Sequence, residues 1–249
     1  MATNTHLQLQ DYDVQVFQQL SDFFVARDDL ERHRSNITQL GDIICNYDME
    51  QYLAVNLLHK HFEITNDELV VREFVGDTAY MKPGKIEEYN TVVPYLWKLA
   101  DGRKGKGFYP LEFIAITDSN WMNQSHSIIE TINQKEDFLD SLAAKLEELG
   151  LVELFGIAAL FSRKPFVLDE KTSLLETTDE ANRVLTLKPA PKSEIKSTDT
   201  TQTLWIFTPP PDKQLSPESQ CVGHCISHCH NHCVNHNRSV ISSKKGESR

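Results

Sequence analysis

The sequence predicts an α+β fold, with mixed helices and antiparallel strands in one globular body and a Cys/His-rich C-terminal segment behind it. Apolar residues recur at helical spacing over 14–32 and 135–149. Alternating, β-branched segments over 68–74 and 109–117 are typical of strands. The chain has 249 residues, of which 40% are hydrophobic, and this is enough to bury the core of one large or two small domains.

The first part of the chain is predicted to hold two helices and a hairpin. The spacing of apolar residues places one helix over 14–32 and a second over 49–58, in the sequence MEQYLAVNLL. Strands are expected over 68–74 and 78–82. They flank Gly76-Asp77, a pair of residues suited to a tight turn, so the two strands should form a hairpin.

The middle of the chain contains one ambiguous segment between clearer ones. Residues 92–99 are either a short helix or a strand interrupted by Pro94, because proline removes one ladder hydrogen bond. Residues 109–117 alternate as a strand does. Residues 135–149 carry leucine and phenylalanine on one helical face, and Gly150 provides the stop signal of a helix C-terminus.

The remainder of the body is predicted to be mainly strand. Residues 152–161 form either a buried strand or a core helix, since periodicity does not separate the two for a short apolar run. Short strands are expected over 173–175 and 184–187, and the polar stretch 189–203 is expected to be a loop. Residues 204–207 (LWIF) form the predicted final strand of the body.

These elements define four predicted regions. Residues 1–208 form the body, whose faint self-resemblance suggests two similar halves of about 1–110 and 111–208. Prolines 209 to 211 begin a stiff spacer over 209–220. A Cys/His repeat occupies 221–236, and a basic polar tail occupies 237–249.

Charge and hydropathy exclude several classes of function. The net charge of −11 disfavours nucleic-acid binding and adhesion to anionic membranes, because both need a basic face. No apolar run is long enough to cross a bilayer, and the first residues lack the features of a secretory signal. We therefore expect a cytoplasmic protein with neither a nucleic-acid nor a membrane partner, and the nucleus is the alternative compartment.

The strongest functional signal is four consecutive C-x-x-H units, which read CVGH-CISH-CHNH-CVNH. Thiolate and imidazole are preferred ligands of zinc and of cuprous copper, so the sequence predicts a metal site, with zinc as the first candidate and copper as the alternative. A disulfide framework is disfavoured because it needs an oxidising compartment. The predicted ligands are Cys221, His224, Cys225, His228, Cys229, His232, Cys233 and His236.

The spacing limits how these residues could surround an ion. Ser216 and Pro217 form a typical helix start, and on a helix the cysteines would make one slowly winding stripe. A single helix offers at most two neighbouring ligands to one ion, so the other ligands would come from a second helix, the body or another subunit. Ligands from another subunit would make a homodimer through this segment. Alternatively, each unit is a tight turn around an ion.

Three further histidines are weaker candidates. His230 lies inside the repeat but outside its four-residue register. His59 and His61 form an H-x-H pair that shares one face only on a strand, whereas a charged helix end is the simpler interpretation of this segment.

The sequence thus predicts a metal-binding protein that holds or senses zinc or copper. One alternative is a metalloenzyme in which the C-terminal segment completes a metal centre on the body, with His59, His61 or a body carboxylate as additional ligands. Another is an interaction module that orders when it binds metal. No motif identifies a catalytic base, a nucleophile or a phosphate-binding loop.

Overall fold

The computed structural model of this chain describes most of the sequence up to Ile226, and all structural statements below refer to that part. The described residues are 7, 12–89, 91–135, 137–164, 166, 168–196, 199–211 and 216–226. Among them, no helix is long and apolar enough to span a membrane.

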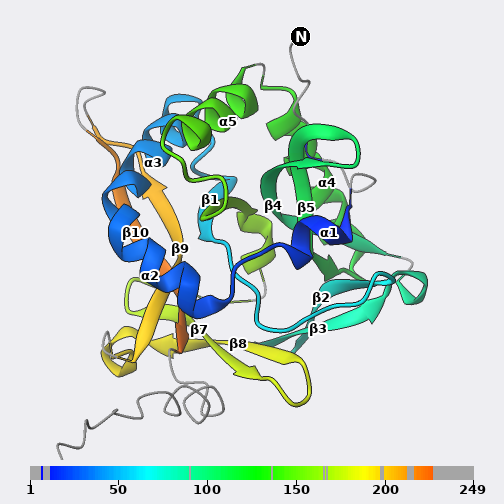
Figure 1. The fold of residues 1–249 in the computed structure, drawn as a ribbon. Helices are drawn as coiled ribbons and strands as arrows, with labels where there is room; N and C mark the ends of the chain where they lie inside the picture. Colours follow the sequence, from blue (N-terminus) through cyan, green and yellow to red (C-terminus); the bar gives the residue numbers. More distant parts are fainter. Residues whose placement is uncertain are drawn as a thin grey trace, which may run out of the picture.

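Ten strands of the described chain close into a barrel, so the predicted α+β body is wrong (Figure 1). Neighbouring strands follow the circular order β1-β6-β4-β5-β2-β3-β8-β7-β10-β9. Local patterns could predict individual strands, but closure depends on pairings between distant segments. The strands are β1 (Leu53–Leu57), β2 (Glu68–Val75), β3 (Thr78–Lys85), β4 (Val92–Gly102), β5 (Gly105–Ala115), β6 (Phe155–Ala159), β7 (Thr172–Asp179), β8 (Val184–Pro191), β9 (Thr200–Thr208) and β10 (Glu218–Ile226).

The barrel also contains parallel pairs, which the prediction of antiparallel strands did not include. The pairs β2 with β5 and β7 with β10 are parallel, and the other pairs are antiparallel. Each of the strands β1–β5 can be exchanged with the strand five places later in the chain, β1 with β6 and so on to β5 with β10. After this exchange every strand keeps the same neighbours, and each pair keeps its parallel or antiparallel direction. The barrel topology therefore has an internal two-fold symmetry that relates its first five strands to its last five.

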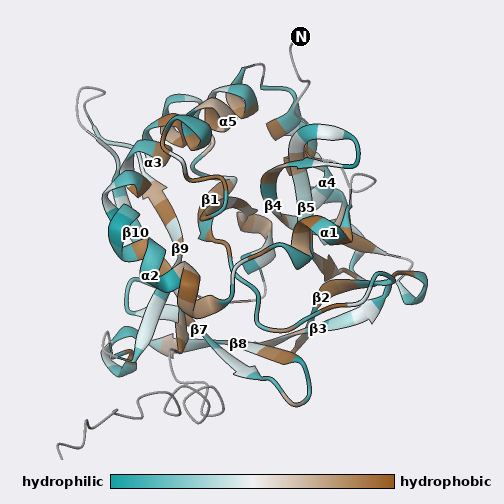
Figure 2. Ribbon diagram, viewed as in Figure 1, coloured by the Kyte–Doolittle hydropathy of each residue, from teal (hydrophilic) through white to brown (hydrophobic). Residues whose placement is uncertain are grey.

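Helices pack against the strands of this barrel. α1 contacts β4 and β5, α3 contacts β1, β9 and β10, and α5 packs on α3. Figure 2 shows hydrophobic positions on the inner sides of α3 and α5, as expected for amphipathic surface helices. The helices are α1 (Val14–Gln18), α2 (Phe23–His33), α3 (Ile37–Asn46), α4 (Ser119–Asn133) and α5 (Phe138–Glu148), with short 3₁₀ turns at Arg34–Asn36, Ile86–Glu88, Leu160–Arg163 and Lys192–Glu194.

Two of the helical predictions need correction. The predicted helix over 14–32 is two helices, α1 and α2. The predicted helix over 49–58 is instead strand β1, in which four of the five residues are buried. A strand buried on both faces loses the polar alternation by which strands are recognised, and its apolar run then resembles a helix.

The ambiguous segments are strands, and several predictions are confirmed. Residues 92–99 lie in β4, whose register shifts near Pro94, and 152–161 contain β6. The hairpin of β2 and β3, strands β5, β7 and β8, and helix α5 occur where the sequence predicts them. The predicted loop over 189–203 is shorter, because β8 runs to Pro191 and β9 begins at Thr200.

The C-terminal segment begins as part of the barrel. The predicted helix start at Ser216 is wrong, because residues 218–226 form strand β10 between β9 and β7. The predicted final strand over 204–207 lies in β9 and is therefore followed by one more. Residues 227–249, which include the rest of the Cys/His repeat and the basic polar tail, lie outside the described residues.

Candidate metal centre in the barrel

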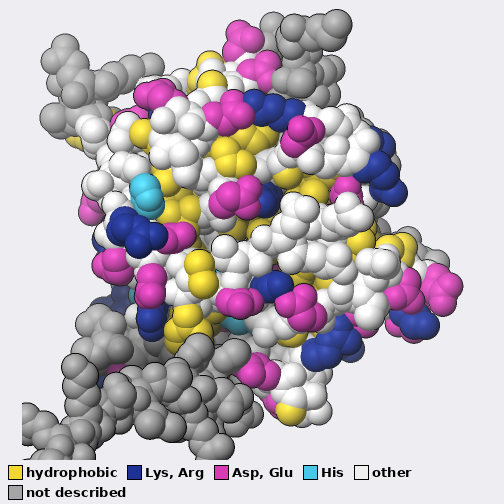
Figure 3. Space-filling model, in the orientation of Figure 1, with side chains coloured by type: hydrophobic (Ala, Val, Ile, Leu, Met, Phe, Trp, Pro, Cys, Tyr) yellow, Lys and Arg dark blue, Asp and Glu magenta, His cyan; other side chains and the backbone are white. Residues whose placement is uncertain are grey.

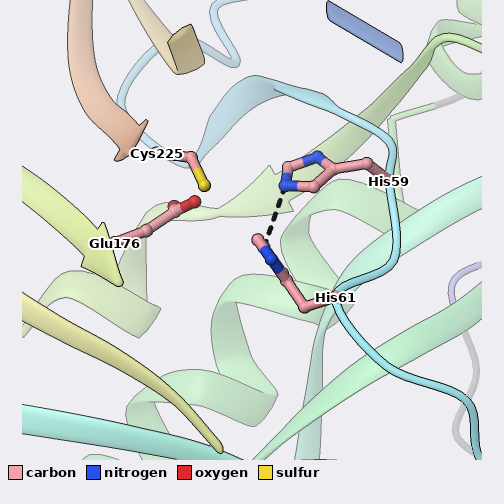
Figure 4. A group of neighbouring side chains, drawn as sticks. All are labelled: His59, His61, Glu176 and Cys225. Atoms are coloured by element: carbon pink, nitrogen blue, oxygen red, sulfur yellow. Dashed lines mark hydrogen bonds between the residues drawn. The ribbon is translucent and has the colours of Figure 1, made fainter. Parts of the chain in front are cut away.

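Four potential ligands meet inside the fold, as Figure 4 shows: His59, His61, Glu176 and Cys225. One ligand atom from each lies within 4.8 Å of those of the other three. They come from distant parts of the chain. The histidines follow β1, while Glu176 and Cys225 are direct partners in the parallel pair of β7 and β10. Paired residues project on the same side of a sheet, which explains why this carboxylate and this thiol meet.

Hydrogen bonds hold both imidazoles by Nδ1. His59 Nδ1 lies 2.9 Å from the carbonyl oxygen of Leu57, and His61 Nδ1 lies 2.8 Å from Oγ1 of Thr178. A carbonyl oxygen only accepts, so His59 donates from Nδ1 and a neutral His59 ring has its lone pair on Nε2. The two Nε2 atoms face each other at 3.0 Å. Both rings therefore present Nε2 to the group.

Burial lowers the pKa of both histidines. The pKa of His59 falls to about 4, although its hydrogen bond to Leu57 opposes this shift. The pKa of His61 lies well below its ordinary value because of burial and, secondarily, the proximity of His59. Both rings are consequently neutral at pH 7, the state in which imidazole binds metal ions.

The carboxyl group of Glu176 lies in an environment that disfavours its charge. Burial is the largest cause that raises its pKa to about 7, and the neighbouring Glu112 raises it further, while Arg72 lowers it. Thr203 Oγ1 donates a hydrogen bond to Oε1 of Glu176 at 3.2 Å and fixes the orientation of the carboxyl group. A bound cation would supply the positive charge that this buried carboxylate lacks.

A polar network continues from the group into the barrel. Arg72 is 7% exposed and donates to the hydroxyl of Tyr95 at 2.7 Å, with its guanidinium 4.2 Å from the centre of the tyrosine ring. The Tyr95 hydroxyl in turn donates to the carboxylate of Glu112. This series of hydrogen bonds places the cation of Arg72 and a second carboxyl group, that of Glu112, near Glu176. The interior of the barrel therefore contains ionisable groups and is not purely apolar.

The aromatic ring of Phe23 covers the two imidazoles. Its centroid lies 5.2 Å from that of His59, edge to face, and 6.3 Å from that of His61, in a stacked arrangement. On the outer side is a cavity of about 530 Å³, whose lining includes Phe23, His61 and Thr178. His61 therefore belongs both to the ligand group and to the wall of a cavity.

The structure brings together three of the predicted ligands, namely Cys225 and the two weaker candidates His59 and His61. Cys221 and His224 contact each other on β10, with Sγ 3.7 Å from Nε2, and are not members of the group. The register of β10 shifts around Gly223, between these two residues. The remaining predicted ligands lie outside the described residues: His228, Cys229, His230, His232, Cys233 and His236.

Glu176 is the member of the group that the sequence did not single out. It is one of 36 acidic residues, and the surrounding LLETTD carries no metal-binding spacing. Only its register opposite Cys225 distinguishes it, and that register is a property of the closed barrel.

Comparisons of this chain with protein-family models, with curated proteins and with solved structures found no match. The geometry of the group itself is therefore the basis for the functional proposal.

Proposed function

We propose that this protein binds a transition-metal ion inside its barrel, with zinc as the first candidate and copper as the alternative. The ligands would be Nε2 of His59, Nε2 of His61, Sγ of Cys225 and a carboxylate oxygen of Glu176. The observation that carries the proposal is the convergence of these four atoms within 4.8 Å, from three segments far apart in the chain.

The donor set selects the class of ion. Two imidazoles, a thiolate and a carboxylate suit zinc or copper, whereas calcium and magnesium prefer oxygen ligands alone. Zinc–nitrogen bonds of about 2.0–2.1 Å at tetrahedral angles would place the two nitrogens about 3.3 Å apart. The observed Nε2 separation of 3.0 Å is close to this value, so the two imidazoles would need to move little to admit an ion.

The surroundings of the ligands also match a metal site. A metal-binding histidine typically donates its other ring nitrogen to a carbonyl, carboxylate or water. Leu57 and Thr178 provide such partners here, and Thr203 orients Glu176. In the absence of an ion, two neutral rings would make this contact as a hydrogen bond from Nε2 of His61 to Nε2 of His59, with Nδ1 of His61 accepting from Thr178. On binding an ion, His61 would carry its proton on Nδ1 instead and donate it to Thr178.

Holding a metal is favoured over metal-dependent catalysis by the number of protein ligands. Four protein ligands fill a tetrahedral zinc site, whereas catalytic sites leave one position open for water or substrate. The cavity beside His61 is the observation that keeps a metalloenzyme as the second candidate function. Metal binding by the rest of the repeat, and a homodimer through it, remain predictions from the sequence.

Elemental analysis of the full-length protein, purified without chelators and equilibrated with zinc, tests the proposal. We expect the double variant His59→Ala/His61→Ala to hold one zinc ion fewer per chain than the wild type. The exposed His126 on α4 provides the control, and His126→Ala should retain the full amount. Equal zinc content in the double variant and the wild type would overturn the proposal.

A nearly isosteric variant distinguishes the loss of a metal ligand from misfolding as the reason for weaker zinc binding. Glu176→Gln keeps the side-chain shape but removes the anionic ligand, so we expect its zinc affinity to fall at least tenfold while its circular dichroism matches the wild type. Glu170→Gln changes an exposed glutamate outside the group and should have no effect. Unchanged affinity in a folded Glu176→Gln protein would exclude Glu176 as a ligand.

A further inference from the structure

The cavity beside His61 adjoins the ligand group, because His61 belongs to both. One cavity has a volume of about 530 Å³, and another has a volume of about 380 Å³. The larger one is lined by His61, and the smaller one, near Asp13 and Arg103, is lined by none of the four ligands. The larger of these two cavities therefore adjoins the ligand group at His61.

The charged side chains around this cavity favour a cation as its occupant. The ammonium of Lys60 is already engaged, because Nζ lies 2.5 Å from Oε1 of Glu63 and 3.3 Å from the carbonyl of Gln18. The guanidinium of Arg183 donates to the carboxylate of Glu68 and to the carbonyl of Glu63. The positive charges in the wall are thus neutralised.

The acidic residues of the cavity wall have carboxylate oxygens that can interact with a cation. Asp22 precedes α2 as its N-cap, yet its carboxylate makes no capping hydrogen bond. Glu63 has a side chain that is 73% exposed and uses one oxygen for Lys60. The whole chain carries a charge of −11, and Figure 3 shows acidic side chains spread over the visible face. The field of the protein should therefore attract divalent cations toward this wall.

Phe23 stands between the cavity and the buried part of the group. Its ring lines the cavity and contacts both imidazoles, whereas His59 does not reach the cavity wall. An ion that enters from the cavity would meet His61 first and would reach His59 after displacement of the Phe23 ring.

We propose that this cavity is the vestibule through which a hydrated divalent metal ion reaches the centre, with His61 as its first ligand and Phe23 as the side chain that moves aside. This inference rests on the proposed function. It adds that the acidic wall governs the rate of metal binding, while the four ligands govern its affinity.

Stopped-flow mixing of the full-length protein with zinc tests the role of the acidic wall. The phase that belongs to the centre is the one missing from His59→Ala/His61→Ala. We expect Asp22→Asn to slow that phase two- to fivefold at low salt, with a smaller effect at high salt because ions screen the attraction. The equilibrium affinity should stay within threefold of the wild type. Glu87→Gln, an exposed change away from the cavity, is the matched control and should leave the rate unchanged.

A second pair of variants tests the role of Phe23. Phe23→Leu keeps an apolar side chain but shortens the barrier, so we expect zinc to bind and dissociate at least threefold faster, with a similar affinity. Phe24→Leu changes the adjacent residue, which also lines the cavity, and should leave both rates unchanged. If neither Asp22→Asn nor Phe23→Leu alters the rates, the ion takes another route and the inference is wrong, although the metal centre stands. If the wild type lacks the phase altogether, the proposed function itself fails.

Discussion

The orientation of His59 and His61 depends on partners that are not themselves ligands. Leu57 and Thr178 each engage an Nδ1 atom, so both Nε2 atoms face the same point. Burial keeps both rings neutral by lowering their pKa values. In the proposed metal site, the two imidazoles are thus already oriented without an ion, which would reduce the cost of ordering them on binding.

Removal of the Thr178 hydroxyl should weaken metal binding without removing a ligand. Thr178→Val keeps the side-chain shape but leaves His61 Nδ1 without its partner, and we expect zinc affinity to fall about 10- to 100-fold. Thr177→Val is the matched control, because successive strand residues point to opposite faces. Isothermal titration of both variants checks this, and equal affinities would show that Thr178 does not position His61.

The ion pair between Glu68 and Arg183 should make stability depend on pH. Arg183 is the main cause that lowers the pKa of Glu68 to about 2. A lowered pKa in the folded state stabilises the protein above the unfolded value of about 4.3, and this stabilisation is lost as pH falls toward 2.

Arg183→Met should therefore destabilise the protein at pH 7 by about 1–2 kcal/mol, a figure reduced for the solvent exposure of the arginine. Urea unfolding should show this difference shrinking between pH 4.5 and pH 2. Arg32→Met, in an exposed pair within α2, should cost less than about 0.5 kcal/mol. A difference between wild type and Arg183→Met that does not change with pH would contradict the assigned pKa.

Strand β10 explains why the repeat could be read only in part from the sequence. The C-x-x-H spacing suits either a helix or a series of turns, and no local signal indicates the strand that the barrel imposes. In that strand Cys225 belongs to the ligand group, while Cys221 and His224 contact each other outside it. The repeat includes Cys225, but the residues that surround its thiol follow from strand pairing rather than from the spacing.

Close packing between β6 and β4 gives a sharp test of the barrel. A Cβ atom on Gly156 would lie 2.4 Å from the carbonyl oxygen of Trp97, so Gly156→Ala should destabilise the fold by about 1–3 kcal/mol. Gly107→Ala in β5 meets nothing within 4 Å and should be neutral or slightly stabilising. Thermal unfolding compares the two variants. Equal effects would mean that β4 and β6 do not approach as closely as described.

The two-fold symmetry of the barrel bears on the number of metal ions. Glu176 and Cys225 pair across β7 and β10 as Arg72 and Ile114 pair across β2 and β5. The symmetry-related position thus carries an arginine and an isoleucine, neither of which binds metal. We therefore expect one ion in the barrel rather than two, despite the duplicated topology.

Zinc should stabilise the entire barrel because its ligands join distant segments. An ion that binds only the folded state contributes about 2.7 kcal/mol when its free concentration is 100 times the Kd. We expect buffered zinc to raise the melting temperature of the wild type. Glu176→Gln should show a much smaller rise, and the exposed variant Glu170→Gln should behave as the wild type does. A rise of equal size in all three proteins would place the stabilising ion elsewhere.

The closed barrel itself lay beyond what the sequence could predict. Hairpins and α5 were predictable because their signals are local, such as Gly76 in a tight turn or Gly150 after a helix, both with positive φ. β1 was not predictable, since burial on both faces removed its alternation. Ring closure depends on pairings such as β1 with β9, between residues about 150 positions apart.

A crystal of the full-length protein grown with zinc offers the most direct test of the metal centre. Diffraction data collected on both sides of the zinc absorption edge locate each bound ion by its anomalous signal. We expect one strong peak between His59, His61, Glu176 and Cys225, within bonding distance of all four ligand atoms. A zinc-loaded crystal with an ordered barrel and no peak at that position would contradict the account.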